Sequence, residues 1–201
     1  MGTFETNFNR GRDIVQASPQ LMIDLDVEAD GTAGYGSLLS IGAVDPFGAT
    51  FYRELRPIDE NFIDSNHEFC EAHGLERSRL LEEGIDPIIA MEDLRIWTLE
   101  QQERHRKVGS VLVAFNASFD YPLVDLEFRR SGIKNPYGIA GYCVKSLAMA
   151  LTKSYDWRQT AKSKLPPDVL PTGDFTHHAL EDALYQQQLH YALVGKLNER
   201  S

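Results

Sequence analysis

Alternating apolar and polar residues predict a β-strand over residues 20–27. Two further runs of this kind follow at 38–44 and 49–55, and the sequence Asp45-Pro46-Phe47-Gly48 between them is typical of a tight turn. Strands joined by so short a turn pair side by side with opposite directions. The pattern therefore predicts three antiparallel strands at the start of the fold.

Helical patterns dominate the rest of the chain. They occupy five ranges, 66–73, 88–106, 118–130, 143–151 and 179–197. The short apolar run at 111–115 predicts a buried central strand between the second and third of these helices. Prolines and glycines in residues 153–176 predict irregular structure there.

This order of elements predicts an α/β fold, in which a mixed β-sheet with the three antiparallel strands first is flanked by helices. The arrangement is compatible with the ribonuclease H-like architecture. Residues 1–19 are polar and show no periodicity, so we interpret them as an N-terminal arm. Residues 20–201 should then form a single domain.

Composition restricts the class of protein. Hydrophobic residues make up 42% and charged residues 25% of the chain, as in soluble globular domains. No apolar run approaches the ~20 residues of a membrane helix, so we expect a cytoplasmic protein without a membrane partner. Cys70 and Cys143 lie far apart in the sequence, which favours two unpaired thiols.

The net charge of −10 argues against a protein that grips long duplex DNA, because such proteins usually present a broad basic face. If the chain acts on nucleic acid, its substrate should be short or single-stranded. Bound cations would then supply much of the local positive charge.

Two carboxylates end the first predicted strand. Asp26 and Glu28 are two residues apart, so they project from the same face of that strand. Paired carboxylates repel each other unless a cation or a proton separates them. Acids at strand ends also commonly do no more than contact solvent, and Asp24 shares the face of Asp26, so this pair alone identifies no site.

A third acid, Asp120, follows the predicted strand 111–115. Just inside a helix that begins after a buried strand, it should lie at the edge of the sheet, where ligands commonly bind. The alternative is a purely structural role. In that case Asp120 would interact with the helix dipole from the first turn, and Asn116 or Ser118 would cap the helix.

The last predicted helix opens with two histidines, His177 and His178, and then Asp182. The small residues Ala179 and Ala183 flank Asp182 and are consistent with close packing against the sheet. A histidine one turn ahead of a buried aspartate can take a proton from water. Paired histidines also open helices near solvent without any chemical role.

Together, the motifs Asp-Val-Glu-Ala-Asp-Gly (26–31), Asn-Ala-Ser-Phe-Asp (116–120) and His-His-Ala-Leu-Glu-Asp (177–182) resemble those of the DEDD exonucleases. Their order is the same, and so are the kinds of element that carry them. The third motif is similar to that of the DEDDh branch, which includes proofreading exonuclease subunits, oligoribonuclease and ribonuclease T. The sister branch has a tyrosine four residues before the last aspartate, where this chain has His178.

The resemblance implies that Asp26, Glu28, Asp120 and Asp182 hold two divalent cations, Mg²⁺ or Mn²⁺. It also implies that His177 is the general base, with a pKa suited to taking a proton at neutral pH.

Near these motifs, three positions depart from the family pattern. Ala29 and Asp30 stand where threonines are frequent, and Phe115 stands where a histidine is frequent. None of these changes removes a carboxylate, so they bear on the shape of the nucleotide pocket rather than on the cations.

Substrate contacts are expected from a few residues close to the motifs. Asn116 belongs to the second motif, and Tyr35, Phe119 and Tyr121 are candidates for stacking on a terminal base. Packing in the core is the alternative for each aromatic residue.

The implied function is a 3′–5′ exonuclease that hydrolyses single-stranded nucleic acid to 5′-monophosphates from the 3′ ends of RNA or DNA, with RNA or short oligonucleotides favoured. Two alternatives use the same fold: a nucleotide phosphohydrolase with the same metals, and a catalytically silent nucleic-acid-binding or scaffold module. The family often forms homodimers, so we expect one here.

Overall fold

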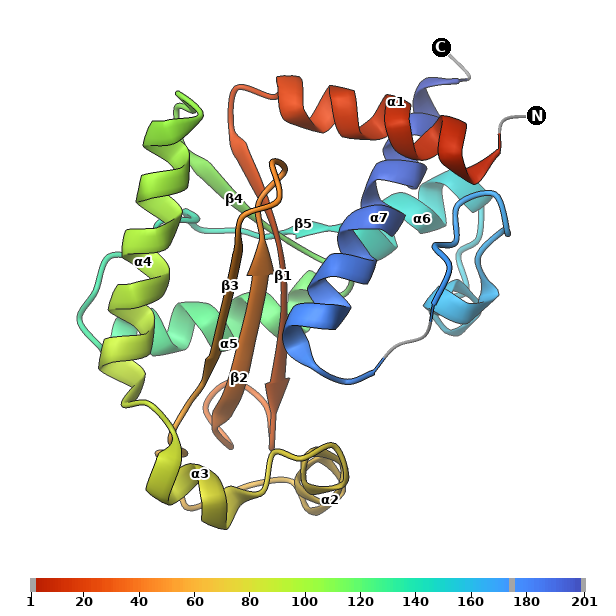
Figure 1. The fold of residues 1–201 in the computed structure, drawn as a ribbon. Helices are drawn as coiled ribbons and strands as arrows, with labels where there is room; N and C mark the ends of the chain where they lie inside the picture. The colour runs from red at the N-terminus through yellow and green to blue at the C-terminus, as the bar shows by residue number, and fades with distance from the viewer. Residues whose placement is uncertain (1–2, 174–175, 200–201) are drawn as a thin grey trace.

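Five strands form one mixed sheet in the order β3-β2-β1-β4-β5 (Figure 1). The structure is a computed structural model that describes residues 3–173 and 176–199. The antiparallel part consists of β1 (Leu21–Ala29), β2 (Leu38–Val44) and β3 (Thr50–Glu54). On the other side of β1, β4 (Ser110–Ala114) and the short β5 (Tyr142–Cys143) run parallel to it. The predicted α/β fold with three antiparallel strands first is confirmed, although β5 was not predicted.

Helices cover both faces of this sheet. On one face lie α4 (Pro87–Arg104) and α5 (Ala117–Arg130), and on the other lie α6 (Val144–Thr152) and α7 (Ala179–Asn198). The predicted ranges of these four helices are correct to within two residues.

Two short helices, α2 (Asp64–Ala72) and α3 (Arg77–Glu83), lie beyond the C-terminal end of β1 (Figure 1). The segment predicted to be irregular contains the two 3₁₀ turns η1 (Trp157–Thr160) and η2 (Lys162–Lys164).

The central strand β1 has two chemically different faces. Its odd-numbered residues join the core beneath α4 and α5; they are Leu21, Ile23, Leu25, Val27 and Ala29. The opposite face carries Asp24, Asp26 and Glu28 towards α7. The period of a strand therefore places three acids in one row beneath the last helix.

The prediction of an N-terminal arm over residues 1–19 is wrong for most of its length, because residues Phe4–Ala17 form the helix α1, which packs on α7 (Figure 1). Only Asn7, Gly11 and Val15 are buried along α1, so its apolar stripe is too short to recognise in the sequence. Gly11 is required by the close packing, since a Cβ built there would lie 1.8 Å from the carbonyl oxygen of Tyr191.

Among the described residues no helix is long and apolar enough to cross a bilayer. Cys70 and Cys143 are both free thiols, as predicted.

The N-terminal end of α7 lies directly on β2. A Cβ built at Gly42 would lie 2.1 Å from the backbone nitrogen of Leu180, so only glycine permits this approach. The buried side chain of Gln186 then holds the middle of α7 to the sheet. Its amide nitrogen donates to the carbonyl of Val113 at 3.0 Å, and its oxygen accepts from the backbone N–H of Phe115 at 2.6 Å.

We expect Gly42→Ala to lower the free energy of unfolding by roughly 1–3 kcal/mol, because the new methyl group forces the helix backbone away from β2. Gly109→Ala is the matched control. No atom lies within 4 Å of a Cβ at Gly109, so its effect should stay within about 1 kcal/mol. Chemical denaturation of both variants measures the difference, and equal stabilities would contradict the proposed close packing.

Candidate active site

A cavity of about 490 Å³ opens where the C-terminal ends of β1 and β4 meet the N-terminal ends of α5 and α7. All five residues expected to carry chemistry line it: Asp26, Glu28, Asp120, His177 and Asp182. The fold therefore brings together residues that are up to 156 positions apart in the sequence.

On β1, the row of acids divides into one buried acid with a structural role and a pair that faces the cavity. Asp24 is fully buried and is held by α7, with its carboxylate 3.3 Å from the amide nitrogen of Gln186 and 3.2 Å from Nδ1 of His190. Asp26 and Glu28 are only partly buried and line the cavity. Contacts with α7 thus separate Asp24 from the pair that faces the cavity.

Asp120 lies in the first turn of α5 and is 5% exposed. Asn116 occupies the N-cap position, but its side chain makes no capping hydrogen bond and instead accepts one from the Ser118 hydroxyl at 2.8 Å. Asn116 and Phe119 both line the cavity, so two of the four predicted substrate contacts lie beside the acids.

The third motif turns sharply before α7 begins. His177 has a left-handed backbone with φ of +58°, and the carboxylate of the following Asp182 accepts from the backbone N–H of Thr176 at 3.1 Å. The His177 ring packs edge-on against Phe69 and His73, with 4.6 Å between ring centroids in each case. One ligand atom each from Glu28, His177 and Asp182 lies within 4.8 Å of the others.

The adjacent His178 points elsewhere. It is the N-cap residue of α7 and its ring stacks on Tyr52 of β3, with 4.4 Å between centroids. The two adjacent histidines therefore face different surroundings.

The four carboxylates strongly disfavour one another's charge. Burial, and to a smaller extent the carboxylate of Asp182, raise the pKa of Asp26 to about 7. Burial together with Asp26 and Asp182 raises the pKa of Glu28 to about 8. Burial also raises the pKa of Asp120 and of Asp182. Without added positive charge, this cluster holds protons at neutral pH.

A lysine that the sequence analysis missed reaches the cluster. Lys162 of η2 lines the cavity, and its ammonium lies 5.2 Å from the ring centroid of Phe115. Burial lowers the pKa of Lys162, whereas attraction to all four carboxylates opposes that shift. The segment that contains Lys162 has no periodicity that would place this residue at the site. The one feature of the sequence that could have indicated it is a group of basic residues in an acidic chain.

The residues of the cavity suit a hard divalent cation. Four carboxylates, two of them buried and two partly buried, supply only oxygen ligands, which Mg²⁺ and Mn²⁺ prefer. Burial, with a smaller contribution from neighbouring carboxylates, raises the pKa values of Asp26 and Glu28 although Lys162 lowers them, so a bound cation would favour their ionised forms. The donor set and its charge therefore fit the cations expected from the sequence.

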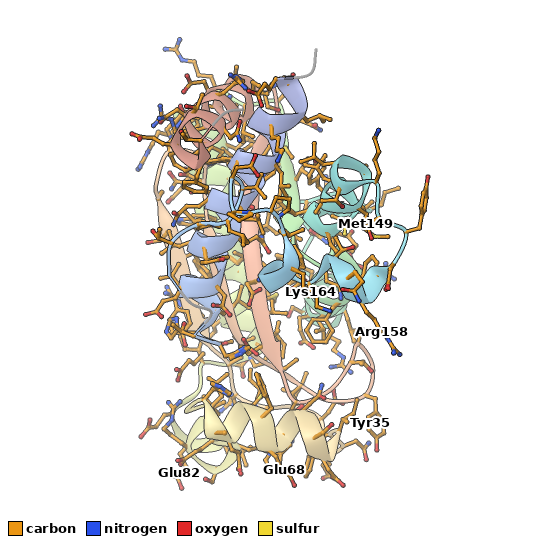
Figure 2. The ribbon with its side chains drawn as sticks, turned by 90° about the vertical axis from the view of Figure 1, so that its right-hand side faces the viewer. Tyr35, Glu68, Glu82, Met149, Arg158 and Lys164 are labelled. Atoms are coloured by element: carbon orange, nitrogen blue, oxygen red, sulfur yellow. The ribbon has the colours of Figure 1, made fainter. Side chains whose placement is uncertain are left out.

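The other two aromatic candidates lie away from the acids. Tyr35 is 51% exposed on the loop after β1 and is not among the residues that line the cavity; Figure 2 shows it near α2. Tyr121 packs against the core, and its hydroxyl donates to the carbonyl of Gly138 at 2.6 Å. The sequence alone does not indicate whether a tyrosine such as Tyr35, on a loop after the first motif, lies near the acids or far from them.

Comparison with known proteins gives one curated relative and several solved structures. No family model matches the chain. This chain is 34% identical to the 3′–5′ DNA exonuclease Cap18 of Escherichia coli over 189 residues, which are 92% of this chain and 97% of the relative.

Two solved structures illustrate the shared fold. The nuclease domain of 3′hExo, a DEDDh family member bound to rAMP, has a TM-score of 0.62 and 11% identity, over 86% of this chain and 90% of that one. The Mg²⁺- and Mn²⁺-bound form of S. pombe Pop2p has a TM-score of 0.61 and 13% identity, over 94% and 87%. At these identities the likeness concerns the fold.

We expect the stability of the chelated protein to fall as pH rises from about 4 to about 8, between the ordinary and the folded pKa values of two carboxylates. The folded pKa values of Asp26 and Glu28, about 7 and 8, exceed their ordinary values of 3.8 and 4.5. The folded state therefore binds more protons than the unfolded state, and the stability that this confers is lost as pH rises through 7 and 8. Thermal unfolding in chelator measures it.

Glu28→Gln should flatten this pH dependence, and Glu68→Gln, an exposed acid of α2, should leave it as in the wild type. Added Mg²⁺ should restore stability at high pH. A chelated protein with constant stability over this range would show that burial and mutual repulsion do not raise the pKa values of these carboxylates.

Proposed function

The chain belongs to the DEDDh family of 3′–5′ exonucleases, and on this premise we propose that it removes nucleotides from the 3′ end of single-stranded DNA as 5′-monophosphates. The observation that carries the proposal is the cavity in which four carboxylates from β1, α5 and α7 meet His177. The named relative acts on DNA, which favours DNA over the RNA expected from the sequence. The net charge of −10 favours a single strand over a duplex.

We assign two divalent cations, Mg²⁺ or Mn²⁺, to this cavity. Asp26, Glu28 and Asp182 would hold one, and Asp26 with Asp120 would hold the other. The oxygen-only donor set and the raised pKa values support the assignment, as does the Mg²⁺- and Mn²⁺-bound form of Pop2p, which shares the fold. Such cations supply positive charge against the transition state and make the attacking water more acidic.

His177 has the environment of a general base. Burial lowers its pKa, and the neighbouring His73 and Lys162 lower it further, against the opposing effect of Asp182. A ring nitrogen is therefore unprotonated at neutral pH and can take a proton from the attacking water. The water oxygen bonds to phosphorus as the bond from phosphorus to O3′ breaks, which leaves a 3′-hydroxyl on the shortened strand.

A panel of 5′-labelled oligonucleotides tests the function. Single-stranded DNA should shorten stepwise from its 3′ end in Mg²⁺ or Mn²⁺. RNA and duplex DNA should shorten more slowly. No substrate should shorten in excess chelator. Asp182→Ala should abolish turnover while the circular dichroism of the fold persists. Early internal fragments, or shortening from the 5′ end, would contradict the proposal. Cleavage of free nucleotides alone would indicate the phosphohydrolase, and complete inactivity the silent module.

The two histidines provide an internal comparison. His177→Ala should lower the rate by roughly 10²–10⁴, the usual effect of losing a general base, and should remove the acid-side limb of the rate against pH. Binding of Mn²⁺, followed by calorimetry, should persist because the carboxylates remain. His178→Ala should cost far less, since its ring stacks on Tyr52 outside the cavity. A larger loss of rate in His178→Ala than in His177→Ala would contradict the assignment of His177 as the base.

A further inference from the structure

One segment of the chain has a charge opposite to the rest. Residues 145–164, which run from the first turn of α6 to the end of η2, contain five of the 20 Lys and Arg residues but only one of the 30 acids. That acid, Asp156, accepts hydrogen bonds from the backbone N–H groups of Arg158 and Gln159 and so is engaged within the loop. A local cationic surface on an acidic protein is suited to a polyanion.

Two aromatic rings stand in the same segment without being buried. Tyr155 is 98% exposed and Trp157 is 43% exposed. The ammonium of Lys145 lies 3.8 Å from the ring centroid of Trp157, in a cation–π contact. Exposed aromatic rings interleaved with cations are the usual means of holding single-stranded nucleic acid without regard to its sequence.

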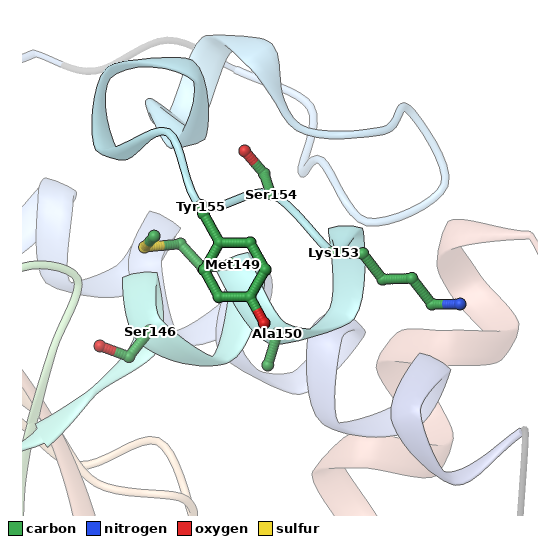
Figure 3. A pocket seen from close by; sticks show the side chains of 6 residues that line it. All are labelled: Ser146, Met149, Ala150, Lys153, Ser154 and Tyr155. Carbon is green, nitrogen blue, oxygen red and sulfur yellow. The ribbon is translucent and has the colours of Figure 1, made fainter.

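A hollow of about 560 Å³ lies beside the ring of Tyr155 (Figure 3). Six residues line it: Ser146, Met149, Ala150, Lys153, Ser154 and Tyr155. Figure 3 shows the ring of Tyr155 extending beside Met149 and Ala150, with the ammonium of Lys153 at one side. An apolar floor with an aromatic wall and a cation at its rim suits an unstacked base and the phosphate attached to it.

The hollow adjoins the catalytic cavity along the chain. Lys145 lines the cavity, the next residue, Ser146, lines the hollow, and the ring of Trp157 lies against Lys145. Lys162 lines the cavity from the other end of the segment. Figure 2 shows Met149, Arg158 and Lys164 on the same side of the molecule, away from Glu68 and Glu82. A strand that leaves the cavity along this segment would reach the hollow with nucleotides on the 5′ side of its 3′ end.

We propose that residues 145–164 bind the nucleotides on the 5′ side of the scissile phosphate, with one base in the hollow against Tyr155. The proposal rests on the function proposed above, because it assumes that the 3′ end of a strand enters the cavity. It names the occupant as a single-stranded oligonucleotide, whose phosphates complement Lys153 and Arg158, both exposed. Strands too short to reach the segment should bind without its help.

The test compares binding of two labelled DNA strands, of three and fifteen nucleotides, with 3′ phosphorothioate linkages that resist cleavage in Mg²⁺. Tyr155→Ala should weaken binding of the longer strand roughly 5- to 150-fold, the range for loss of one stacked base. Lys153→Gln combined with Arg158→Gln should reduce the slope of log affinity against log salt by about 1.4, at about 0.7 for each cation. The shorter strand should lose little affinity to any of these variants.

The matched control is Lys134→Gln combined with Arg104→Gln, two exposed cations that follow or end helices on the α4 and α5 side of the sheet. Thermal unfolding confirms that each variant folds. A long-strand affinity within twofold of this control would overturn the proposal, as would an equal loss for both strands. Tight binding of a polyglutamate peptide would also overturn it, by showing a surface for any polyanion.

Cleavage of an ordinary strand is measured separately. In steady-state kinetics the loss should fall on KM for long strands. A wild-type protein that binds the longer strand through this segment, yet cuts nothing, would refute the proposed function while leaving the binding surface intact.

Discussion

The close approach of α7 to the sheet sets the geometry on which the cavity depends. Gly42 lets the first turn of α7 touch β2, and Gln186 ties its middle to β1 and β4. Because His177 and Asp182 stand at the start of this helix, its distance from β1 fixes how near they come to Asp26 and Glu28. On its outer side α7 is braced by α1, again through glycine at the point of closest contact.

This framework holds charges together that would otherwise separate. Burial and mutual repulsion raise the pKa of Asp26 to about 7, and that of Glu28 to about 8, so the cluster disfavours its own ionised form. The surrounding structure supplies the compensating stability through apolar packing on the other face of β1. An arrangement suited to cations is therefore one that lowers the stability of the protein when no cation is bound.

Much of this could be predicted from sequence where a simple period applies. The two-residue spacing of Asp26 and Glu28 gave their shared face, and the position of Asp120 after an apolar strand gave its place at the sheet edge. The helix α1 was not predicted because Gly11 suggests a break in a helix. Of its three buried residues, Asn7, Gly11 and Val15, only Val15 has a large apolar side chain. The positions of Lys162 and Tyr35 relative to the cavity depend on the paths of irregular segments through the fold. No local sequence pattern predicts such a path.

The pairing of α1 with α7 joins residues about 180 positions apart, so neither helix finds its partner until nearly all of the described chain has been made. The same holds for the catalytic centre, since the third motif arrives with α7. On the ribosome, a nascent chain that ends before residue 177 carries three of the four carboxylates and lacks His177. The order of synthesis thus delays nuclease activity until α7 has been made and has packed on the sheet.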